Sequence, residues 1–109
     1  MQTFFKGWRL KLSNLLKSIA AKSVFGKKEE ERMEKTEVVS IHYRAQEVKQ
    51  GGMFVAIQGH ATDGHDYIDV ALANGASAII TQKPVDRDSI IIEVEETRKA
   101  LSSLPADFY

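Results

Sequence analysis

One stretch of the sequence, from Gly51 to Ile80, restricts the fold more than any other. It begins with a short apolar run, Met53–Ile57, which is bounded by glycines and is typical of a buried strand. A loop of small and polar residues follows, and the apolar residues after it recur at helical spacing: Tyr67, Ile68, Ala71 and Leu72. The pair Asn74-Gly75 ends this helix, and the run Ala76–Gln82 is a second strand. Two strands that flank a helix in so short a stretch indicate a layered α/β core.

The segments on either side extend this pattern. Val38–Tyr43 has β-branched residues in alternation, so we expect a strand there. Ser89–Glu95 is apolar enough to form a strand that is buried on both faces. A last helix begins near Glu96, is interrupted by Pro105, and has one apolar side: Thr97, Ala100, Leu101 and Leu104. The sequence therefore predicts an α/β fold with a small mixed sheet of four to five strands and flanking helices.

The first third of the chain has a different character. Its apolar residues recur at helical spacing and predict an amphipathic helix from Ser13 to about Ser23: Leu12, Leu15, Leu16 and Ile19. Such a helix either docks on its own domain, which we favour, or lies at a membrane interface with Trp8 on its apolar side. The charged run Gly26–Lys35 is interpreted as a solvated linker. We therefore divide the chain into a basic N-terminal helix with a charged linker, residues 1–36, and an α/β domain, residues 37–109.

Composition sets limits on the function. The 109 residues suit one domain, and the lack of cysteine excludes disulfides and thiolate metal sites. Residues 1–36 carry five more basic than acidic side chains, and residues 37–109 carry five more acidic than basic ones. We interpret the basic segment as a solvated helix face and predict no nucleic-acid partner. No apolar run is long enough to span a bilayer or to act as a secretory signal, which favours the cytoplasm. The sequence does not predict an oligomeric state.

Few residues suggest catalysis. The sequence lacks the phosphate-loop pattern G-x-x-x-x-G-K-[ST], the nucleophile pattern G-x-S-x-G and the zinc pattern H-E-x-x-H. His42, His60 and His65 do not have the spacing of a metal site, so we predict neither a metal nor a catalytic residue in this chain. Asp63 and Asp66 are either an acid–base pair or, as we favour, capping residues at a helix start.

The loop Gln58–Gly64, with the sequence QGHATDG, is the better candidate for a ligand site. It joins the end of a strand to the start of a helix, where ligands of α/β proteins often bind. Gly59 and Gly64 permit a ligand to approach the backbone closely. A planar ring with alternating donors and acceptors, such as uracil, suits recognition by backbone groups and one imidazole. An ordinary tight turn explains the same spacing equally well.

This region resembles the N-terminal domain of the Mur ligases. It is most similar to the UDP-N-acetylmuramoyl-dipeptide ligases, which add the third residue of the peptidoglycan stem peptide. The resemblance rests on residues that match in register: Val48, Gly51, Phe54-Val55-Ala56, Gly59, Asp63-Gly64-His65, Tyr67, Gly75-Ala76 and Ala78-Ile79-Ile80. It covers about residues 10–109, with a poor match over residues 24–36.

The resemblance implies that the domain binds the UDP part of a UDP-N-acetylmuramoyl peptide, or UDP itself. By position it places His60, Ala61 and Thr62 beside the uracil, with Gly59 allowing the approach. The other half of the family's pocket is an aspartate-serine-arginine triplet, and this chain has Arg44-Ala45-Gln46 there. Ala45 therefore lacks the serine hydroxyl, whose hydrogen bond is worth on the order of 1 kcal/mol. Arg44 is a candidate to contact a phosphate in its place.

The resemblance also implies which parts of the ligase machinery lie elsewhere. Members of the family continue into an ATP-binding domain with a phosphate loop, so ATP and magnesium would belong to domains outside these residues, and we expect no cofactor in this chain. Three hypotheses stay open. The chain is the substrate-recognition domain of a truncated ligase, a free-standing relic that acts as a non-catalytic binding or interaction module, or a generic α/β domain whose first helix docks on a protein or an anionic surface. None of them predicts ligation by this chain alone.

Overall fold

A computed structural model describes residues 10–11, 21–25, 36–59, 61–87 and 89–104 of the chain. Several predictions fall outside these ranges. They are the amphipathic spacing of residues 12–20 with Trp8 beside it, the linker at residues 26–35, the position of His60, and the interruption at Pro105.

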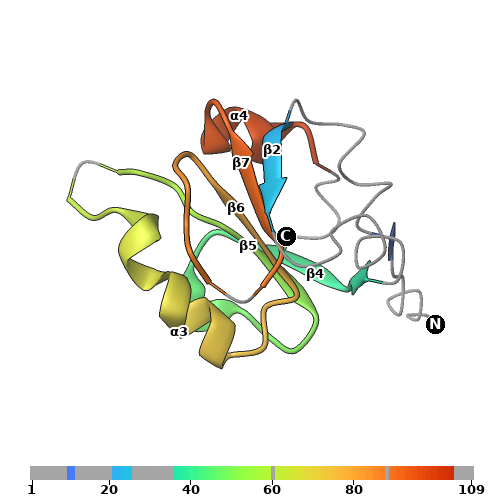
Figure 1. The fold of residues 1–109 in the computed structure, drawn as a ribbon. Helices are drawn as coiled ribbons and strands as arrows, with labels where there is room; N and C mark the ends of the chain where they lie inside the picture. The colour runs from blue at the N-terminus through green and yellow to red at the C-terminus, as the bar shows by residue number, and fades with distance from the viewer. Residues whose placement is uncertain (1–9, 12–20, 26–35, 60, 88, 105–109) are drawn as a thin grey trace.

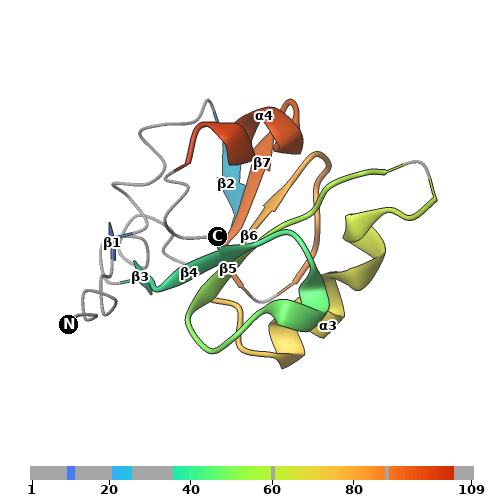
Figure 2. The same ribbon diagram turned by 180° about the vertical axis from the view of Figure 1, so that it is seen from behind.

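A five-stranded sheet forms the centre of the fold (Figures 1 and 2). Its strands lie in the order β2 (Ala21–Phe25), β7 (Ile91–Val94), β6 (Ala78–Thr81), β5 (Gly52–Val55) and β4 (Ser40–His42). Neighbours from β4 to β7 are parallel, whereas β2 is antiparallel to β7. A second, two-stranded sheet pairs β1 (Leu10–Lys11) with β3 (Glu37–Val38). The predicted α/β fold with a small mixed sheet is confirmed.

Successive side chains of each strand point to opposite faces of the central sheet. Each face is covered by an apolar cluster. Met53, Val55 and Ile80 lie in one apolar cluster with Ala100 and Leu104, so α4 (Thr97–Ser102) packs on that face. On the other face the cluster is formed by residues of the sheet, of α3 (Ile68–Ala73) and of the 3₁₀-helix η3 (Ala45–Glu47): Ala45, Val48, Phe54, Ala56, Ile68, Ala71, Ile79 and Ile91. Figures 1 and 2 show α3 and α4 on opposite sides of the sheet. This explains why the strands read as continuous apolar runs.

The helix predicted after the loop ends at Asn74-Gly75, as expected. α3 follows a second 3₁₀-helix, η4 (Gly64–Tyr67), and its C-cap is Asn74. Gly75 has a φ of 101°, a left-handed conformation that favours glycine, and its carbonyl accepts a hydrogen bond of 2.9 Å from the backbone N–H of Gly51. The turns before β5 and β6 are thus joined at the amino ends of these strands.

The N-terminal helix prediction is wrong at its end. The helix was expected to reach about Ser23, but residues 21–25 form strand β2, in which Val24 pairs with Ile92 and Phe25 with Ile91. β2 covers the edge of β7, which would otherwise present unpaired backbone groups. Residues 21–25 thus join the sheet although they precede the predicted boundary at residue 36. None of the helices in the described ranges has the length and apolar character needed to cross a bilayer.

Candidate functional site

The parallel strands place several loops at one edge of the sheet. Tyr43 and Arg44 follow β4, the loop from Ile57 to Gly64 follows β5, and the start of α4 follows β7. Because the carboxyl ends of parallel strands lie at the same edge, these three segments meet there. Ligands of α/β proteins commonly bind in the crevice at this edge.

The loop after β5 folds back on itself. The N–H of Gly59 donates to the carbonyl of Thr62 at 2.8 Å, and the N–H of Gly64 donates to the carbonyl of Ile57 at 2.8 Å. A Cβ atom at Gly64 would lie only 2.7 Å from the backbone nitrogen of Ile57, so glycine is required there by the close approach of the two backbone segments. The loop is therefore a narrow turn that projects from the sheet, with Gly59 and Thr62 near its tip.

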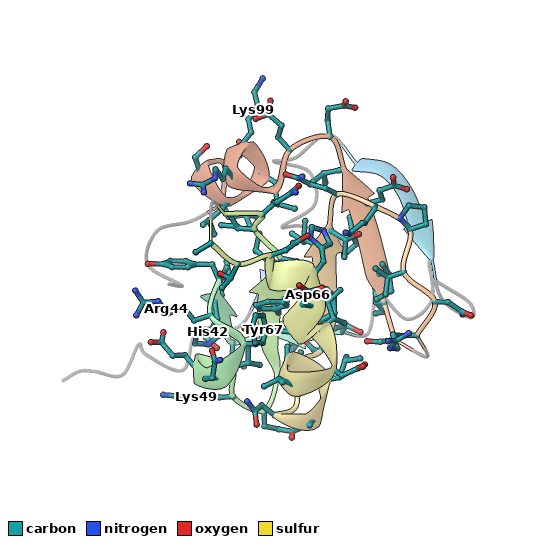
Figure 3. All side chains as sticks on the ribbon, turned by 90° about the vertical axis from the view of Figure 1, so that its left-hand side faces the viewer. His42, Arg44, Lys49, Asp66, Tyr67 and Lys99 are labelled. Atoms are coloured by element: carbon teal, nitrogen blue, oxygen red, sulfur yellow. The ribbon has the colours of Figure 1, made fainter. Side chains whose placement is uncertain are left out.

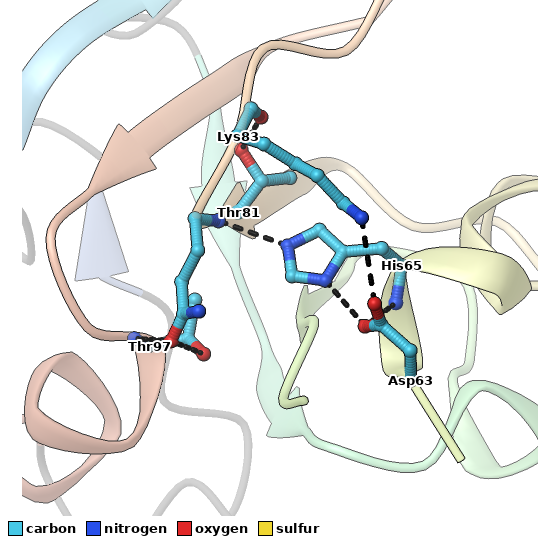
Figure 4. A network of polar contacts seen from close by, with 6 residues as sticks. Asp63, His65, Thr81, Lys83 and Thr97 are labelled. Atoms are coloured by element: carbon cyan, nitrogen blue, oxygen red, sulfur yellow. Dashed lines mark hydrogen bonds and ion pairs between the residues drawn. The ribbon is translucent and has the colours of Figure 1, made fainter. Parts of the chain in front are cut away.

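His65 fixes the end of this loop to the segment that follows strand β6 (Figure 4). Its Nε2 accepts a hydrogen bond of 2.9 Å from the backbone N–H of Gln82, and its Nδ1 lies 2.6 Å from Oδ1 of Asp63. Since a backbone N–H can only donate, Nε2 must be unprotonated, and the proton on Nδ1 is donated to Asp63. The imidazole is 4% exposed, so this contact is a buried structural bond.

Asp63 acts as a helix cap, as predicted. Its Oδ1 accepts from the backbone N–H of His65 at 2.9 Å, and the ammonium of Lys83 lies 3.4 Å from Oδ2. Partial burial alone would raise the pKa of Asp63, but the hydrogen bonds from His65 and Lys83 outweigh it, so the pKa lies below its usual value. Asp66 is exposed and belongs to the first turn of η4.

The same network continues to helix α4. Oε1 of Gln82 accepts hydrogen bonds from the backbone N–H of Thr97 at 2.9 Å and from its hydroxyl at 3.0 Å. Gln82 therefore binds the loop after β5 through its backbone and the start of α4 through its side chain. This residue joins two of the three segments at the carboxyl edge.

The third segment is held against α3 by packing and by a hydrogen bond from a side chain. Ala45 is 2% exposed and lies in the cluster under α3, and its carbonyl accepts from the side-chain amide of Asn74 at 3.0 Å. Arg44 precedes it in an extended conformation and points outward (Figure 3). Its guanidinium lies 3.6 Å from the carboxylate of Glu47 and 5.7 Å from the ring centroid of Tyr43. Arg44 is thus a surface cation on a fixed backbone.

An open cleft of about 580 Å³ lies between these segments. The described residues that line it are Tyr43, Arg44, Ile57, Gly59, Thr62, Arg98 and Leu101. The structure therefore brings together three of the predicted site residues, Arg44, Gly59 and Thr62. Ala45 is buried in the core and does not line the cleft. Gln46 and Ala61 are exposed and do not line it either, and His60 lies outside the described residues.

Four lining residues were not predicted as site residues: Tyr43, Ile57, Arg98 and Leu101. Leu101 was predicted only as a core residue on the apolar side of the last helix, because the spacing of apolar residues identifies that side. Arg98 lies on the polar side, where spacing carries no information. The available signal was its charge, since Arg98 and Lys99 form a basic pair in the acidic part of the chain.

The cleft combines positive charge with apolar surface. Of the described residues that line it, two are arginines and none is a carboxylate, while Tyr43, Ile57 and Leu101 supply apolar atoms. Such a surface suits an anion that carries a planar or apolar part. Within the described part of the chain, no three His, Asp or Glu residues gather closely enough to hold a metal ion.

Comparisons with known proteins point to one family. Residues 37–109 match the Mur ligase family, catalytic domain. The chain is 37% identical over 102 residues to UDP-N-acetylmuramoyl-L-alanyl-D-glutamate--2,6-diaminopimelate ligase of Oceanobacillus iheyensis, covering 92% of this chain and 20% of that protein. It is 41% identical over 76 residues to the protein of the same name from Bacillus licheniformis, covering 70% of this chain and 16% of the relative.

Solved structures agree on the fold. A crystal structure of MurF from Acinetobacter baumannii superposes with a TM-score of 0.75 at 22% identity, over 88% of this chain and 20% of that chain. MurF ligase from Thermotoga maritima, solved in complex with ADP, gives a TM-score of 0.55 at 40% identity, over 58% of this chain and 15% of that chain. The chain thus spans about a fifth or less of the length of the relatives it matches.

Proposed function

Because the chain belongs to the Mur ligase family, we propose that its cleft binds the uridine diphosphate part of a UDP-N-acetylmuramoyl peptide, a precursor of peptidoglycan. The names of the relatives from O. iheyensis and B. licheniformis contain such a compound, UDP-N-acetylmuramoyl-L-alanyl-D-glutamate. We assign recognition to this chain and no catalytic step. We also propose a cytoplasmic location, where nucleotide-activated precursors are used.

The observation that carries the proposal is the meeting of two separate segments in one cleft. Arg44 comes from the segment before Val48, and Gly59 and Thr62 come from the loop after β5. These are the segments that the family resemblance assigns to the two halves of the nucleotide pocket. The volume of about 580 Å³ lies within the range of ordinary small-molecule sites.

The chemistry of the lining supports the same ligand. Ile57, Leu101 and the ring of Tyr43 offer apolar surface to a pyrimidine ring, and Gly59 leaves the backbone open to its polar edge. The guanidinium groups of Arg44 and Arg98 offer charge-assisted hydrogen bonds to a diphosphate. Arg44 is free to make such bonds, because its exposed pair with Glu47 is worth only about 0–1 kcal/mol.

Calorimetry tests the proposal. UDP-N-acetylmuramoyl-L-alanyl-D-glutamate, UDP and ADP are titrated into the 109-residue chain, and we expect one site that binds the two uridine compounds more tightly than ADP. Gly59→Val should abolish binding, because a branched side chain would fill the wall of the cleft. Gln46→Ala is the matched control, since Gln46 is exposed outside the cleft, and it should bind as the unmodified chain does.

A second candidate function is that of a non-catalytic interaction module. Ala45 favours it, because a buried alanine offers no hydroxyl to a nucleotide at the position where the family resemblance implies serine. The calorimetric result separates the two candidates. Absence of any heat with millimolar UDP and millimolar UDP-N-acetylmuramoyl dipeptide would contradict nucleotide recognition and support the module.

A further inference from the structure

We infer that Arg98 gives the cleft its preference for a nucleoside diphosphate over the bare nucleoside, an inference that rests on the proposed nucleotide binding. Arg98 is an exposed residue of α4 and lines the cleft together with Arg44, Gly59 and Thr62. It comes from a different element from either predicted half of the pocket. It therefore adds a third side to the site.

Arg98 is more available to a ligand than Arg44, the other arginine among the described lining residues. Arg44 has a carboxylate partner, Glu47, at 3.6 Å. Among the described residues, the ion pairs involve Arg44, His65, Lys83 and Arg87, and Arg98 takes part in none of them. An anionic ligand that binds Arg98 thus breaks no existing ion pair in this part of the chain.

The chemistry of arginine suits a diphosphate. A guanidinium presents parallel N–H donors that bind two phosphate oxygens at once, and such charge-assisted bonds are about twice as strong as neutral ones. None of the described residues that line the cleft carries a carboxylate to oppose them. Ala45 supplies no hydroxyl, and the arginines are the charged donors among the described lining residues.

Hydrogen bonds hold the backbone of Arg98 in place relative to the loop. Thr97, its neighbour in sequence, is buried and donates two hydrogen bonds to the side chain of Gln82. The backbone N–H of the same Gln82 donates to His65, and His65 bonds to Asp63 at the end of the loop that carries Gly59 and Thr62. Two walls of the cleft are therefore fixed to one residue, so the backbone that carries Arg98 is in place before a ligand binds. A preorganised site of this kind loses less conformational entropy on binding than a site whose segments must first be ordered.

Lys99 provides a matched control. It is adjacent to Arg98 in α4, carries the same charge and is also exposed, but it does not line the cleft. Figure 3 shows that Lys99 projects away from the body of the molecule. Lys99→Gln thus removes one positive charge from the same helix without altering the lining.

The experiment compares UDP, UMP and uridine as ligands of the 109-residue chain and of the variants Arg98→Gln, Arg98→Lys and Lys99→Gln. Dissociation constants are measured by NMR titration, which reaches the millimolar range. We expect Arg98→Gln to weaken UDP binding about tenfold or more, to weaken UMP binding less, and to leave uridine binding within about twofold. Arg98→Lys should recover part of the loss, because it restores the charge but not the paired donors. Lys99→Gln should bind all three ligands as the unmodified chain does.

Two results would overturn the inference while leaving the proposed function intact. One is UDP binding that Arg98→Gln leaves unchanged. The other is an equal loss for UDP and uridine, which would mean that the substitution disturbs the cleft as a whole. Failure of the unmodified chain to bind UDP at millimolar concentration is a different outcome, and it would overturn both the inference and the proposed function.

Discussion

Gly64 is the residue at which two segments of backbone approach each other most closely beneath the loop. In Gly64→Ala the added Cβ would lie 2.7 Å from the nitrogen and 3.0 Å from the oxygen of Ile57, and a backbone neighbour cannot rotate away. We expect a loss of roughly 1–3 kcal/mol in the free energy of unfolding, measured by urea denaturation. Gly59→Ala is the comparison variant and should lose less stability, because the nearest described neighbour of its Cβ, the carbonyl oxygen of Thr62, would lie farther away, at 3.2 Å. Equal stability of the two variants would contradict this loop geometry.

His42 makes the stability of the protein depend on pH. Its Nε2 lies 2.8 Å from the hydroxyl of Ser40, and its pKa is lowered mainly by burial, with Lys49 adding to the effect and Glu47 opposing it. The unfolded chain therefore binds a proton at higher pH than the folded chain does. The stabilising contribution of neutral His42 is complete above the ordinary histidine pKa of about 6.5 and is lost as the pH falls through the folded value.

We expect the free energy of unfolding, measured by chemical denaturation, to decrease from pH 7.5 to pH 5.5. The variant His42→Gln should show a smaller decrease over the same range, because it removes the proton uptake at this position. Asp63 acts in the same direction at more acidic pH, since its lowered pKa makes its stabilising contribution disappear as the carboxylate is protonated. A stability that rises on acidification, or an equal pH dependence in His42→Gln, would refute this assignment.

At the scale of secondary-structure elements, β2 decides whether β7 is an inner strand or an edge. β2 pairs with β7 from Ala21 to Phe25, next to strand residues that are almost completely buried. We expect a chain of residues 36–109 to unfold at lower urea concentration than a chain of residues 21–109 and to aggregate more readily, because an apolar strand edge is left unpaired. Both chains lack β1, and they differ by residues 21–35, of which residues 21–25 form β2. Identical denaturation curves would show that β2 does not stabilise the sheet.

The elements differ in how well the sequence predicts them. The strands at Met53–Ile57, Ala76–Gln82 and Ser89–Glu95 were predicted because their apolar runs end at glycine, proline or polar residues, and such local signals are sufficient for buried strands. Val38–Tyr43 was predicted as one strand, and the structure divides it into β3 and β4, which pair with different partners. Residues 21–23 were wrongly assigned to a helix from the spacing of the apolar residues before them. Their conformation is determined by pairing with β7, far along the chain, which local spacing does not report.

At the scale of the whole molecule, the cleft is a product of topology. Parallel strands bring the ends of β4, β5 and β7 to one edge of the sheet, so residues that are distant in sequence line one cleft. The family resemblance predicted two of these segments, through Arg44, Gly59 and Thr62. It did not predict the third, because the position of α4 above that edge follows from the packing of Ala100 and Leu104 against the sheet. The burial of Ala45 was equally unpredictable, since it depends on contacts with α3.

The most direct test of nucleotide recognition at this edge is a map of backbone amide shifts in the ¹⁵N-labelled chain during titration with UDP. We predict shifts at Arg44, Gly59, Thr62 and Arg98, at the carboxyl ends of the parallel strands. The turns at Gly51 and Gly75 should not shift, because they lie at the amino ends of β5 and β6. Shifts confined to those turns, or no shifts at millimolar UDP, would contradict the account.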